Sequence, residues 1–541
     1  MEFPRKDIDE LENNEKTLKL QITDWYIPEN DKSRPKKNYD EEQDLYTMLI
    51  YGTDENNITY SINVIEYEPY FYVKGPESWD EYSDKKYQEK VNELNFILLN
   101  EKYESQWNGK KYKKNIISNH FKDHFNNLSV VKKKEFWGFT NDKIFNYIKV
   151  SVKSLALFNQ LKYYFSARKK DGFILYESNI DPFIRYIHEQ DLKPCGWISI
   201  EDYEVSDNET RCNYNVTTNY KNVKPLNINR IAPLLIASFD IECTSSHGDF
   251  PLAKKDYKKV AQDLTNVARN GYEIDKSYLV YWLQRIITKD VVIDDNLIIN
   301  KIYPKKNIKT EDIPKMIEKN SDNIIKLLNK VSEIDVDDED DDEISDKNKL
   351  SISEINKLED DINKLLTESL PPLVGDEIIQ IGTTIHRYGC PDIIYKNIIS
   401  LNTCDKIEDC DVIECKTEKE VIMEWKKLIS ELNPDVLIGY NIFGFDMSYL
   451  WDRTLELGIN DLFAMGLGRQ ITKKCILKEQ SLSSSALGDN TLKYFDMDGI
   501  VIIDLLKVMQ KDFKLDSYKL DNVASIYIGD KKDDLKPREL F

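Results

Sequence analysis

Two acids spaced two residues apart are the first feature of this sequence that could do chemistry. Asp240 and Glu242 close the apolar run 234–243. Because side chains two apart in a strand point to the same face, this spacing predicts that both acids project into one volume. Neighbouring carboxylates repel each other unless a cation lies between them. The pattern favours a divalent-metal site, although an Asp-x-Glu pair at a strand end is also common without one.

A third acid follows a second apolar strand further along the chain. This strand leads through a glycine-containing turn at 439–444 to Asp446, directly before a helix expected over Met447–Leu457. An acid in this position ordinarily caps its helix. Together with Asp240 and Glu242, however, Asp446 supplies a carboxylate at a strand-to-helix corner, where α/β folds place their chemistry.

The elements between these acids indicate how they are positioned. Gly375–His386 and Ile393–Leu401 are apolar runs separated by a Tyr-Gly turn signal, which predicts an antiparallel hairpin. A helix is expected over Lys416–Leu432, before the strand that leads to Asn441. The expected order is therefore a strand with acids, a hairpin, a helix, a second strand and a helix that begins with an acid. This order resembles a ribonuclease-H-like nuclease domain.

Longer motifs around the acids extend this pattern. Ser238–Cys243 resembles the first exonuclease motif of family B DNA polymerases of the eukaryotic delta type, and Gly439–Asn441 with Phe445–Asp446 resembles the second. Cys243 stands where some members of that family have Thr. Further stretches resemble the family too, in the right order: Glu68–Val73, Tyr176–Ile180, Gly196–Ile198, Asp504–Met509, Leu515–Ala524 and Lys532–Leu535.

The resemblance implies a domain organisation. We expect a mixed α+β polymerase N-terminal domain over residues 1–232 and an α/β, ribonuclease-H-like 3′→5′ exonuclease domain over residues 233–541. The exonuclease domain carries an insertion at 252–373, which most members of the family replace with a short link. Helix-spaced apolar residues predict helices in the insertion over Tyr257–Asn270, Tyr278–Thr288, Ile313–Val331 and Ile352–Leu370.

The resemblance also implies two-metal phosphodiester hydrolysis with two Mg²⁺ or Mn²⁺ ions. Asp240 would bridge both ions, Glu242 would hold the ion that carries the attacking water, and Asp446 would support the second ion. Asn441, Phe445 and Tyr440 would contact the 3′ end of a single DNA strand. From the residues alone, Asn441 could instead stabilise a turn, and for Phe445 a place in the core is about as well supported as a contact with DNA.

The family's third exonuclease motif, a Tyr four residues before an Asp, is not found. Tyr518 has Asn522 at that offset and Tyr527 has Lys531, and no Tyr-Gly-Asp-Thr-Asp-like palm motif is present. We therefore expect an N-terminal part of a polymerase that works in cis or in trans with a C-terminal half. Residues 1–541 alone are expected to retain little exonuclease activity, because a metal site short of a ligand loses affinity and geometry.

Composition limits the class of protein. The chain has 541 residues, 41% of them hydrophobic, which is ample for several packed domains. It shows no signal peptide and no apolar segment near the ~20 residues that span a bilayer. Its eight cysteines form no Cys-x-x-Cys pair, which favours a cytoplasmic or nuclear protein over a secreted one. Abundant Lys, Asn, Ile and Tyr suggest an AT-rich genome, and we expect a large DNA virus as the source.

The net charge of −21 is unusual for a DNA-binding chain. Residues 333–346 contain ten acids and no Lys or Arg, and we expect this run to be disordered. Lys110–Lys114 and Lys132–Lys134 are candidate DNA-contacting stripes, although a solvated surface explains them more simply. The insertion could dock a partner such as a processivity factor or mimic DNA, but a tolerated insertion is the simpler explanation.

Two classes of function remain. The first is the proofreading part of a replicative DNA polymerase, which three converging acids favour. The second is a non-catalytic scaffold, a truncated or split copy that only binds DNA or the C-terminal half. An RNA-directed nuclease of the same fold is a distant third. We take the polymerase interpretation forward.

Overall fold

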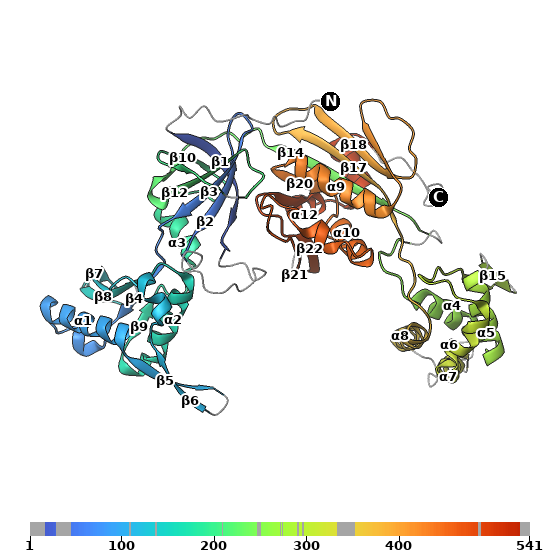
Figure 1. The fold of residues 1–541 in the computed structure, drawn as a ribbon, viewed down its shortest axis with the longest axis horizontal. Coiled ribbons are helices and arrows are strands. Elements are labelled where there is room, and N and C mark those ends of the chain that lie inside the picture. The colour runs from blue at the N-terminus through green and yellow to red at the C-terminus, as the bar shows by residue number, and fades with distance from the viewer. Residues whose placement is uncertain are drawn as a thin grey trace.

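The computed structural model has the form of an arch (Figure 1). A sheet from the N-terminal residues and the sheet that carries the predicted acids lie side by side at the top, and a smaller part lies below each end. The structure describes residues 17–530, except for 29–44, 108–109, 136–137, 208, 246–249, 271, 273, 289–290, 295–296, 333–351 and 485–487.

The sheet that carries the acids has six strands in the order β19-β18-β17-β14-β20-β23. They are β14 (Leu235–Cys243), β17 (Ile378–Arg387), β18 (Ile393–Leu401), β19 (Asp411–Cys415), β20 (Val436–Gly439) and β23 (Val501–Asp504). β17 and β18 form the predicted antiparallel hairpin. β14 pairs antiparallel with β17 and parallel with β20, so the carboxyl ends of β14 and β20 lie at the same edge of the sheet.

Helices complete the core of this part. The two expected helices are confirmed as α9 (Glu418–Leu432) and α10 (Asp446–Glu456). Trp425 of α9 is fully buried against Phe239 of β14, with ring centroids 4.9 Å apart. The remaining elements are α11 (Asn460–Ala464), α12 (Leu505–Asp512), α13 (Leu520–Tyr527) and the hairpin of β21 (Leu477–Ser484) and β22 (Gly488–Phe495).

The N-terminal residues are mixed α and β, as predicted, and contain two sheets with separate cores. The first sheet has the order β11-β12-β3-β2-β1-β10-β13 and consists of β1 (Leu18–Tyr26), β2 (Met48–Thr53), β3 (Thr59–Ile65), β10 (Trp197–Ile200), β11 (Glu204–Val205), β12 (Tyr214–Asn219) and β13 (Val223–Leu226). The second has the order β7-β8-β4-β9 and consists of β4 (Tyr70–Lys74), β7 (Ser129–Lys134), β8 (Ile144–Ser151) and β9 (Ile174–Tyr176).

Three helices accompany these sheets: α1 (Asp84–Asn100), α2 (Leu155–Ala167) and α3 (Pro182–Glu189). A separate hairpin of β5 (Lys102–Trp107) and β6 (Lys110–Asn115) carries one of the two lysine stripes. The other stripe lies on β7, where Lys132 and Lys134 are exposed and pair with Asp84 and Asp142. These lysines thus lie on a solvated surface, and their contact with DNA stays a prediction.

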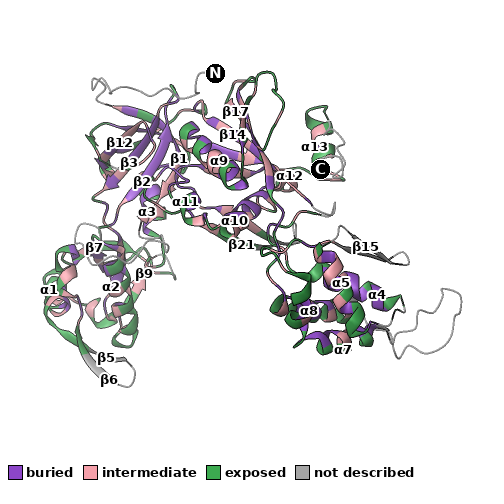
Figure 2. Cartoon of the chain, turned by 45° about the vertical axis from the view of Figure 1, so that its right-hand side comes forward, coloured by how far each residue is buried: buried purple, intermediate pink, exposed green. Residues whose placement is uncertain are grey.

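The insertion is a small helical module with its own core. Its helices are α4 (Lys258–Arg269), α5 (Lys276–Thr288), α6 (Ile313–Ile317), α7 (Ser321–Ser332) and α8 (Ile352–Ser369). Figure 2 shows buried residues on the inward sides of these helices and exposed residues outside. A hairpin of β15 (Val291–Asp294) and β16 (Leu297–Asn300) was not predicted. The acidic run 333–346 lies outside the described residues.

The single helix predicted over Ile313–Val331 is wrong, because the structure has two helices there. Asn320 lies at the break, and its side-chain amide donates to Ser369 Oγ at 2.9 Å and to the Leu365 carbonyl oxygen at 3.3 Å, both on α8. A contact with a distant helix therefore overrides the local helical pattern.

A buried polar cluster joins the first N-terminal sheet to the acid-bearing sheet. The Asp435 carboxylate accepts hydrogen bonds from Thr53 Oγ1 at 2.5 Å and from the Leu235 amide at 2.7 Å. Arg469, which is fully buried, donates to the same carboxylate at 2.7 Å. A buried charge is tolerated only with such partners, so the cluster fixes how the two sheets meet.

Candidate functional site

Asp240 and Glu242 lie on the same face of β14, as their spacing predicts. Burial alternates along the strand: Phe239 and Ile241 are buried, Asp240 is exposed and Glu242 is half-buried. On the neighbouring strand β17, the residue opposite Asp240 is Gly382, and nothing lies within 4 Å of where its side chain would start. The strand thus presents Asp240 to open space at the centre of the sheet.

Asp446 reaches this strand from α10. It is the first residue of the helix and is only 3% exposed. Its carboxylate accepts a hydrogen bond from its own backbone amide, and Oδ1 also accepts one from the Ile241 amide of β14 at 3.3 Å. The Ile241 amide lies between the two acids of β14, so this bond places the third carboxylate beside them.

Asp240 and Asp446 lie close enough for the charge of one to act on the other. Burial is the largest factor that raises the pKa of Asp446, to about 7, and the negative charge of Asp240 is the second. Two carboxylates so close cannot both ionise without cost unless a positive charge joins them. Among the described residues, however, no three His, Cys, Asp or Glu side chains gather closely enough to hold a metal ion. The structure thus brings Asp240 and Asp446 together, with Glu242 nearby on the same strand face.

The turn from β20 into α10 is held by close backbone packing. A side chain at Gly439 would meet the Phe239 carbonyl oxygen at 2.9 Å and the Ile442 side chain at 2.3 Å, so only glycine fits there. Asn441 adopts a left-handed conformation with φ of 66°, which asparagine tolerates better than most residues. Its carbonyl oxygen accepts the Phe445 amide at 3.0 Å. This supports the turn-stabilising role for Asn441 and does not test its predicted contact with DNA.

Asp504 is a positioning residue whose role the sequence did not reveal. Its carboxylate accepts hydrogen bonds from the amides of Asn441 at 2.8 Å, Phe443 at 3.1 Å and Leu506 at 2.9 Å. It therefore caps α12 and fixes the turn before Asp446 at the same time. In the sequence, an Asp between an apolar strand and a helix indicates a helix cap. Only the fold shows that the turn between β20 and α10 lies beside it.

The other predicted DNA-contacting residues lie around the acids. The Phe445 ring is half-buried and packs against Tyr449 at 5.0 Å and against the exposed Phe250 at 5.2 Å between ring centroids. The Tyr440 hydroxyl donates to the Tyr518 carbonyl oxygen. Phe445 therefore belongs partly to the core, while one side of its ring meets an exposed aromatic residue.

A cavity of about 540 Å³ opens beside Asp240 on the strand face that bears it. Its walls include Gly382 of β17, Tyr440 after β20 and Leu520 of α13. The cavity is large enough to admit part of a ligand next to Asp240.

This fold and these motifs define a class of protein. Residues 173–287 and 280–523 match the family model "DNA polymerase family B, exonuclease domain". The match covers more than half of the chain, and the chain therefore belongs to family B DNA polymerases with an exonuclease domain.

Viral DNA polymerases are among the most similar relatives. The chain is 39% identical to the DNA polymerase of Pyramimonas orientalis virus over 95% of its own length and 42% of that protein. It is 28% identical to the DNA polymerase of Phaeocystis pouchetii virus over 92% of its length and 53% of that protein. The chain thus spans about half or less of the curated relatives it matches. The family B DNA polymerase of Pyrobaculum calidifontis aligns in structure at 12% identity with a TM-score of 0.43, over 94% of this chain and 39% of that one.

Proposed function

We propose that this chain carries the 3′→5′ proofreading exonuclease of a family B DNA polymerase that replicates viral DNA. The convergence of Asp240 and Asp446 where β14 and α10 meet is the observation that carries the proposal. The six-stranded sheet with α9 and α10 would be a ribonuclease-H-like domain over residues 233–541, after an N-terminal domain over residues 1–232. The match to the exonuclease-domain model supports this assignment.

The acids fit divalent metal ions. The charge of Asp240 helps to raise the pKa of Asp446, and a cation would stabilise the two carboxylates together; Mg²⁺ and Mn²⁺ prefer such oxygen ligands. Asp240 and Asp446 would hold the ions, with Glu242 as the further ligand from the same strand face. When bound, two such ions supply the charge that activates water and stabilises the leaving oxygen in phosphodiester hydrolysis. The chain supplies rigid placement, since Asp240 is on a central strand and Asp446 is fixed by the Ile241 amide.

The substrate would be the 3′ end of a single DNA strand. Asn441 and Phe445 belong to the turn that leads from β20 to Asp446. Tyr440, in the same turn, lines the cavity beside Asp240. They would therefore hold the terminal nucleotides by stacking and hydrogen bonding. The remaining partners in this proposal are the C-terminal polymerase half and a processivity factor, in the cytoplasm or nucleus of an infected cell. Among the described residues, no helix is both long and apolar enough to cross a membrane.

Metal binding tests the proposal directly. Residues 1–541 are titrated with Mn²⁺, and binding is measured as the loss of the paramagnetic signal of the free ion. Binding should be saturable, and Asp240→Asn and Asp446→Asn should each weaken it at least tenfold. Asp461→Asn is the matched control, because that carboxylate is exposed on α11 and far from β14 in sequence and packing. Equal binding by all variants would remove the basis of the proposal and favour the scaffold interpretation.

A second measurement concerns activity. In the polymerase that contains this chain, Asp240→Asn should abolish removal of a mismatched 3′ nucleotide while extension of a matched primer continues. Loss of both activities together would indicate a folding defect, and loss of neither would contradict the assigned site.

A further inference from the structure

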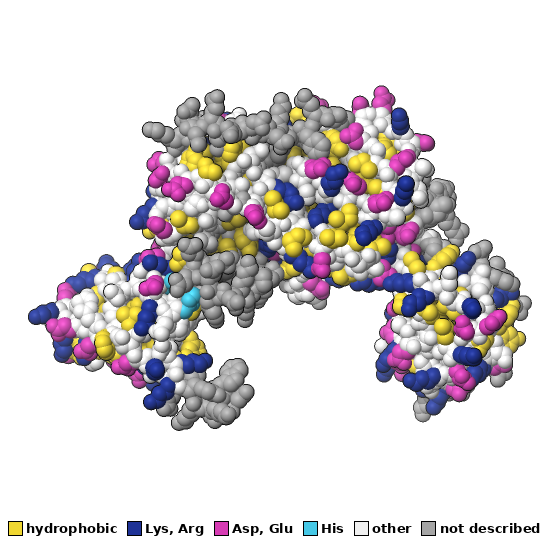
Figure 3. Space-filling view, viewed as in Figure 1, with side chains coloured by type: hydrophobic (Ala, Val, Ile, Leu, Met, Phe, Trp, Pro, Cys, Tyr) yellow, Lys and Arg dark blue, Asp and Glu magenta, His cyan; other side chains and the backbone are white. Residues whose placement is uncertain are grey.

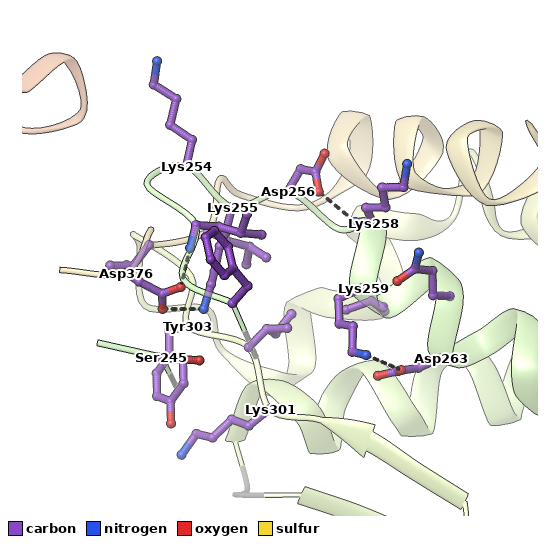
Figure 4. A pocket seen from close by; sticks show the side chains of 17 residues that line it. Ser245, Lys254, Lys255, Asp256, Lys258, Lys259, Asp263, Lys301, Tyr303 and Asp376 are labelled. Atoms are coloured by element: carbon purple, nitrogen blue, oxygen red, sulfur yellow. Dashed lines mark hydrogen bonds and ion pairs between the residues drawn. The ribbon is translucent and has the colours of Figure 1, made fainter. Parts of the chain in front are cut away.

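A pocket of about 520 Å³ lies where the insertion joins the acid-bearing part of the chain. Figure 4 shows this junction pocket, whose walls come from the incoming segment after β14, from α4 and from the segments around Tyr303 and Val374. The insertion thus builds a concave surface that neither part has alone. None of the residues assigned to the acid site lines it.

The junction pocket is built on a rigid base. Leu252, where the chain enters the insertion, and Asp376, where it leaves, are joined by two hydrogen bonds. The Asp376 amide donates to the Leu252 carbonyl oxygen at 2.8 Å, and the Leu252 amide donates to Asp376 Oδ2 at 2.9 Å. Lys255 Nζ completes the contact with Asp376 Oδ1 at 2.6 Å. The two segments therefore hold the pocket in one shape before any ligand arrives.

Lysines surround the junction pocket. Its lining contains five lysines against three aspartates, in a chain whose net charge is −21. Lys258 and Lys259 are about half exposed, at 49% and 50%, and Lys301 lies on the opposite wall (Figure 4). Lys258 pairs with Asp360 at the surface, where such pairs are weak. Lys259 Nζ lies 3.9 Å from the carboxylate of the buried Asp263, at the limit of an ion pair. Figure 3 shows basic side chains gathered where the two parts meet.

Exposed aromatic rings stand among these lysines. Phe250 is 73% exposed and Tyr303 is 46% exposed, and both line the junction pocket. Exposed rings beside cations offer a ligand both a stacking surface and positive charge. Basic groups that follow a phosphate backbone and rings that stack on bases are together the features by which proteins bind single-stranded nucleic acid.

The junction pocket also adjoins the acid site. The Phe250 ring lies 5.2 Å from the ring of Phe445, which directly precedes Asp446. A strand bound over Phe250 would therefore continue toward the acids without leaving the protein surface.

We propose that the junction pocket binds single-stranded DNA, with phosphates on Lys258, Lys259 and Lys301 and bases on Phe250 and Tyr303. The direction of that strand, toward the acids, rests on the proposed exonuclease function; the binding itself does not. The insertion would thereby add a strand-binding surface to the polymerase rather than serve only as a tolerated loop.

Fluorescence anisotropy with a labelled oligothymidylate of about 15 nucleotides tests this proposal. The protein is the full chain, in a chelator so that no metal at the acids contributes. The triple variant Lys258→Ala/Lys259→Ala/Lys301→Ala should bind at least tenfold more weakly, and the dependence of log Kd on log salt should fall by about 2, since each phosphate contact to a single strand contributes about 0.7. Phe250→Ala and Tyr303→Ala should each weaken binding about fivefold or more.

A matched control removes three lysines from the same module. Lys315, Lys319 and Lys326 are exposed and do not line the junction pocket, so their triple alanine variant should bind like the wild type. An equal loss in both triple variants, or in neither, would overturn the proposal. Binding of an oligoglutamate peptide that is tighter than that of the oligonucleotide, and that the pocket triple variant loses, would assign the pocket to an acidic protein partner instead.

Crosslinking supplies a readout that needs no variant to fold. A bromodeoxyuridine-containing strand irradiated with the wild-type chain should form adducts at residues 250–259 or 301–303, and adducts only elsewhere would refute the site. The chelator separates this proposal from the nuclease assignment, because strand binding is then measured without metal at the acids, whereas Mn²⁺ binding by Asp240→Asn tests the acids alone. If that variant binds Mn²⁺ normally, the nuclease assignment fails alone and the strand-binding surface stands.

Discussion

Replacing Asp446 by Asn should stabilise the metal-free protein above neutral pH. Asp446 is 3% exposed, and burial together with the Asp240 charge raises its pKa to about 7 from an ordinary value of 3.8. The native carboxyl therefore keeps its proton to a higher pH than the unfolded chain does. Its ionisation costs stability progressively as pH rises from about 4 to about 7, and the full cost is present above that range.

The magnitude follows from the shift. About three pKa units at 1.36 kcal/mol each correspond to roughly 4 kcal/mol. Asn has nearly the same shape, its carbonyl oxygen can still accept the Ile241 amide, and it carries no charge to repel Asp240. Melting temperatures of the two proteins should therefore be similar near pH 4. At pH 8 the Asn variant should melt about 8–16 °C higher, since 1 kcal/mol corresponds to about 2–4 °C for a part of this size.

Thermal unfolding followed by circular dichroism between pH 4 and 8 measures this difference, with Asp461→Asn as the control. Mg²⁺ at pH 8 should raise the melting temperature of the wild type, because a cation removes the repulsion, and should have little effect on Asp446→Asn. A difference between variant and wild type that does not change with pH would refute the electrostatic reasoning. Equal stabilisation of both proteins by Mg²⁺ would refute the assignment of Asp446 to the metal site.

Three further changes test how the site is supported. Arg453→Met should lower the free energy of unfolding by about 3–5 kcal/mol in thermal melts, because it leaves the buried Glu418 carboxylate without its charge partner; Glu418→Gln in the same chain should recover part of the loss. Asp435→Ala should expose the boundary between the two large sheets to limited proteolysis, because it removes the acceptor of the fully buried Arg469. Gly375→Ala should speed amide exchange at the base of the insertion, because its new carbon would lie 2.0 Å from a carbonyl oxygen.

The positions of the acids were predictable because they depend on local periodicity. The alternation along β14 requires Asp240 and Glu242 to share a face, and burial in the structure follows that alternation. The parallel pairing of β14 with β20 then places Asp446 at the same edge. A hydrophobic pattern also identified the hairpin and α9, since these elements bury one continuous face each.

Buried charge pairs were not predictable from the same patterns. Glu418 and Arg453 occupy helix positions where a charged residue is ordinarily solvated, and nothing in either helix indicates a partner. In the structure they form two hydrogen bonds, at 2.7 and 2.5 Å, in the interior between α9 and α10. Which charges are buried depends on how distant segments pack, and the local pattern contains no information on that packing.

Helix α10 links the features that sequence reasoning treated separately. Asp446 is its first residue and faces β14. One turn on, the Tyr449 hydroxyl donates to the Asp376 carbonyl oxygen at 2.9 Å, and a further turn on, Arg453 donates to the Ala253 carbonyl oxygen at 2.8 Å. Because residues 446, 449 and 453 lie on one face of a helix, a single rigid element holds both the buried acid and the base of the insertion. The base of the insertion is therefore bonded to the helix that positions Asp446, although the insertion is a separate module in sequence.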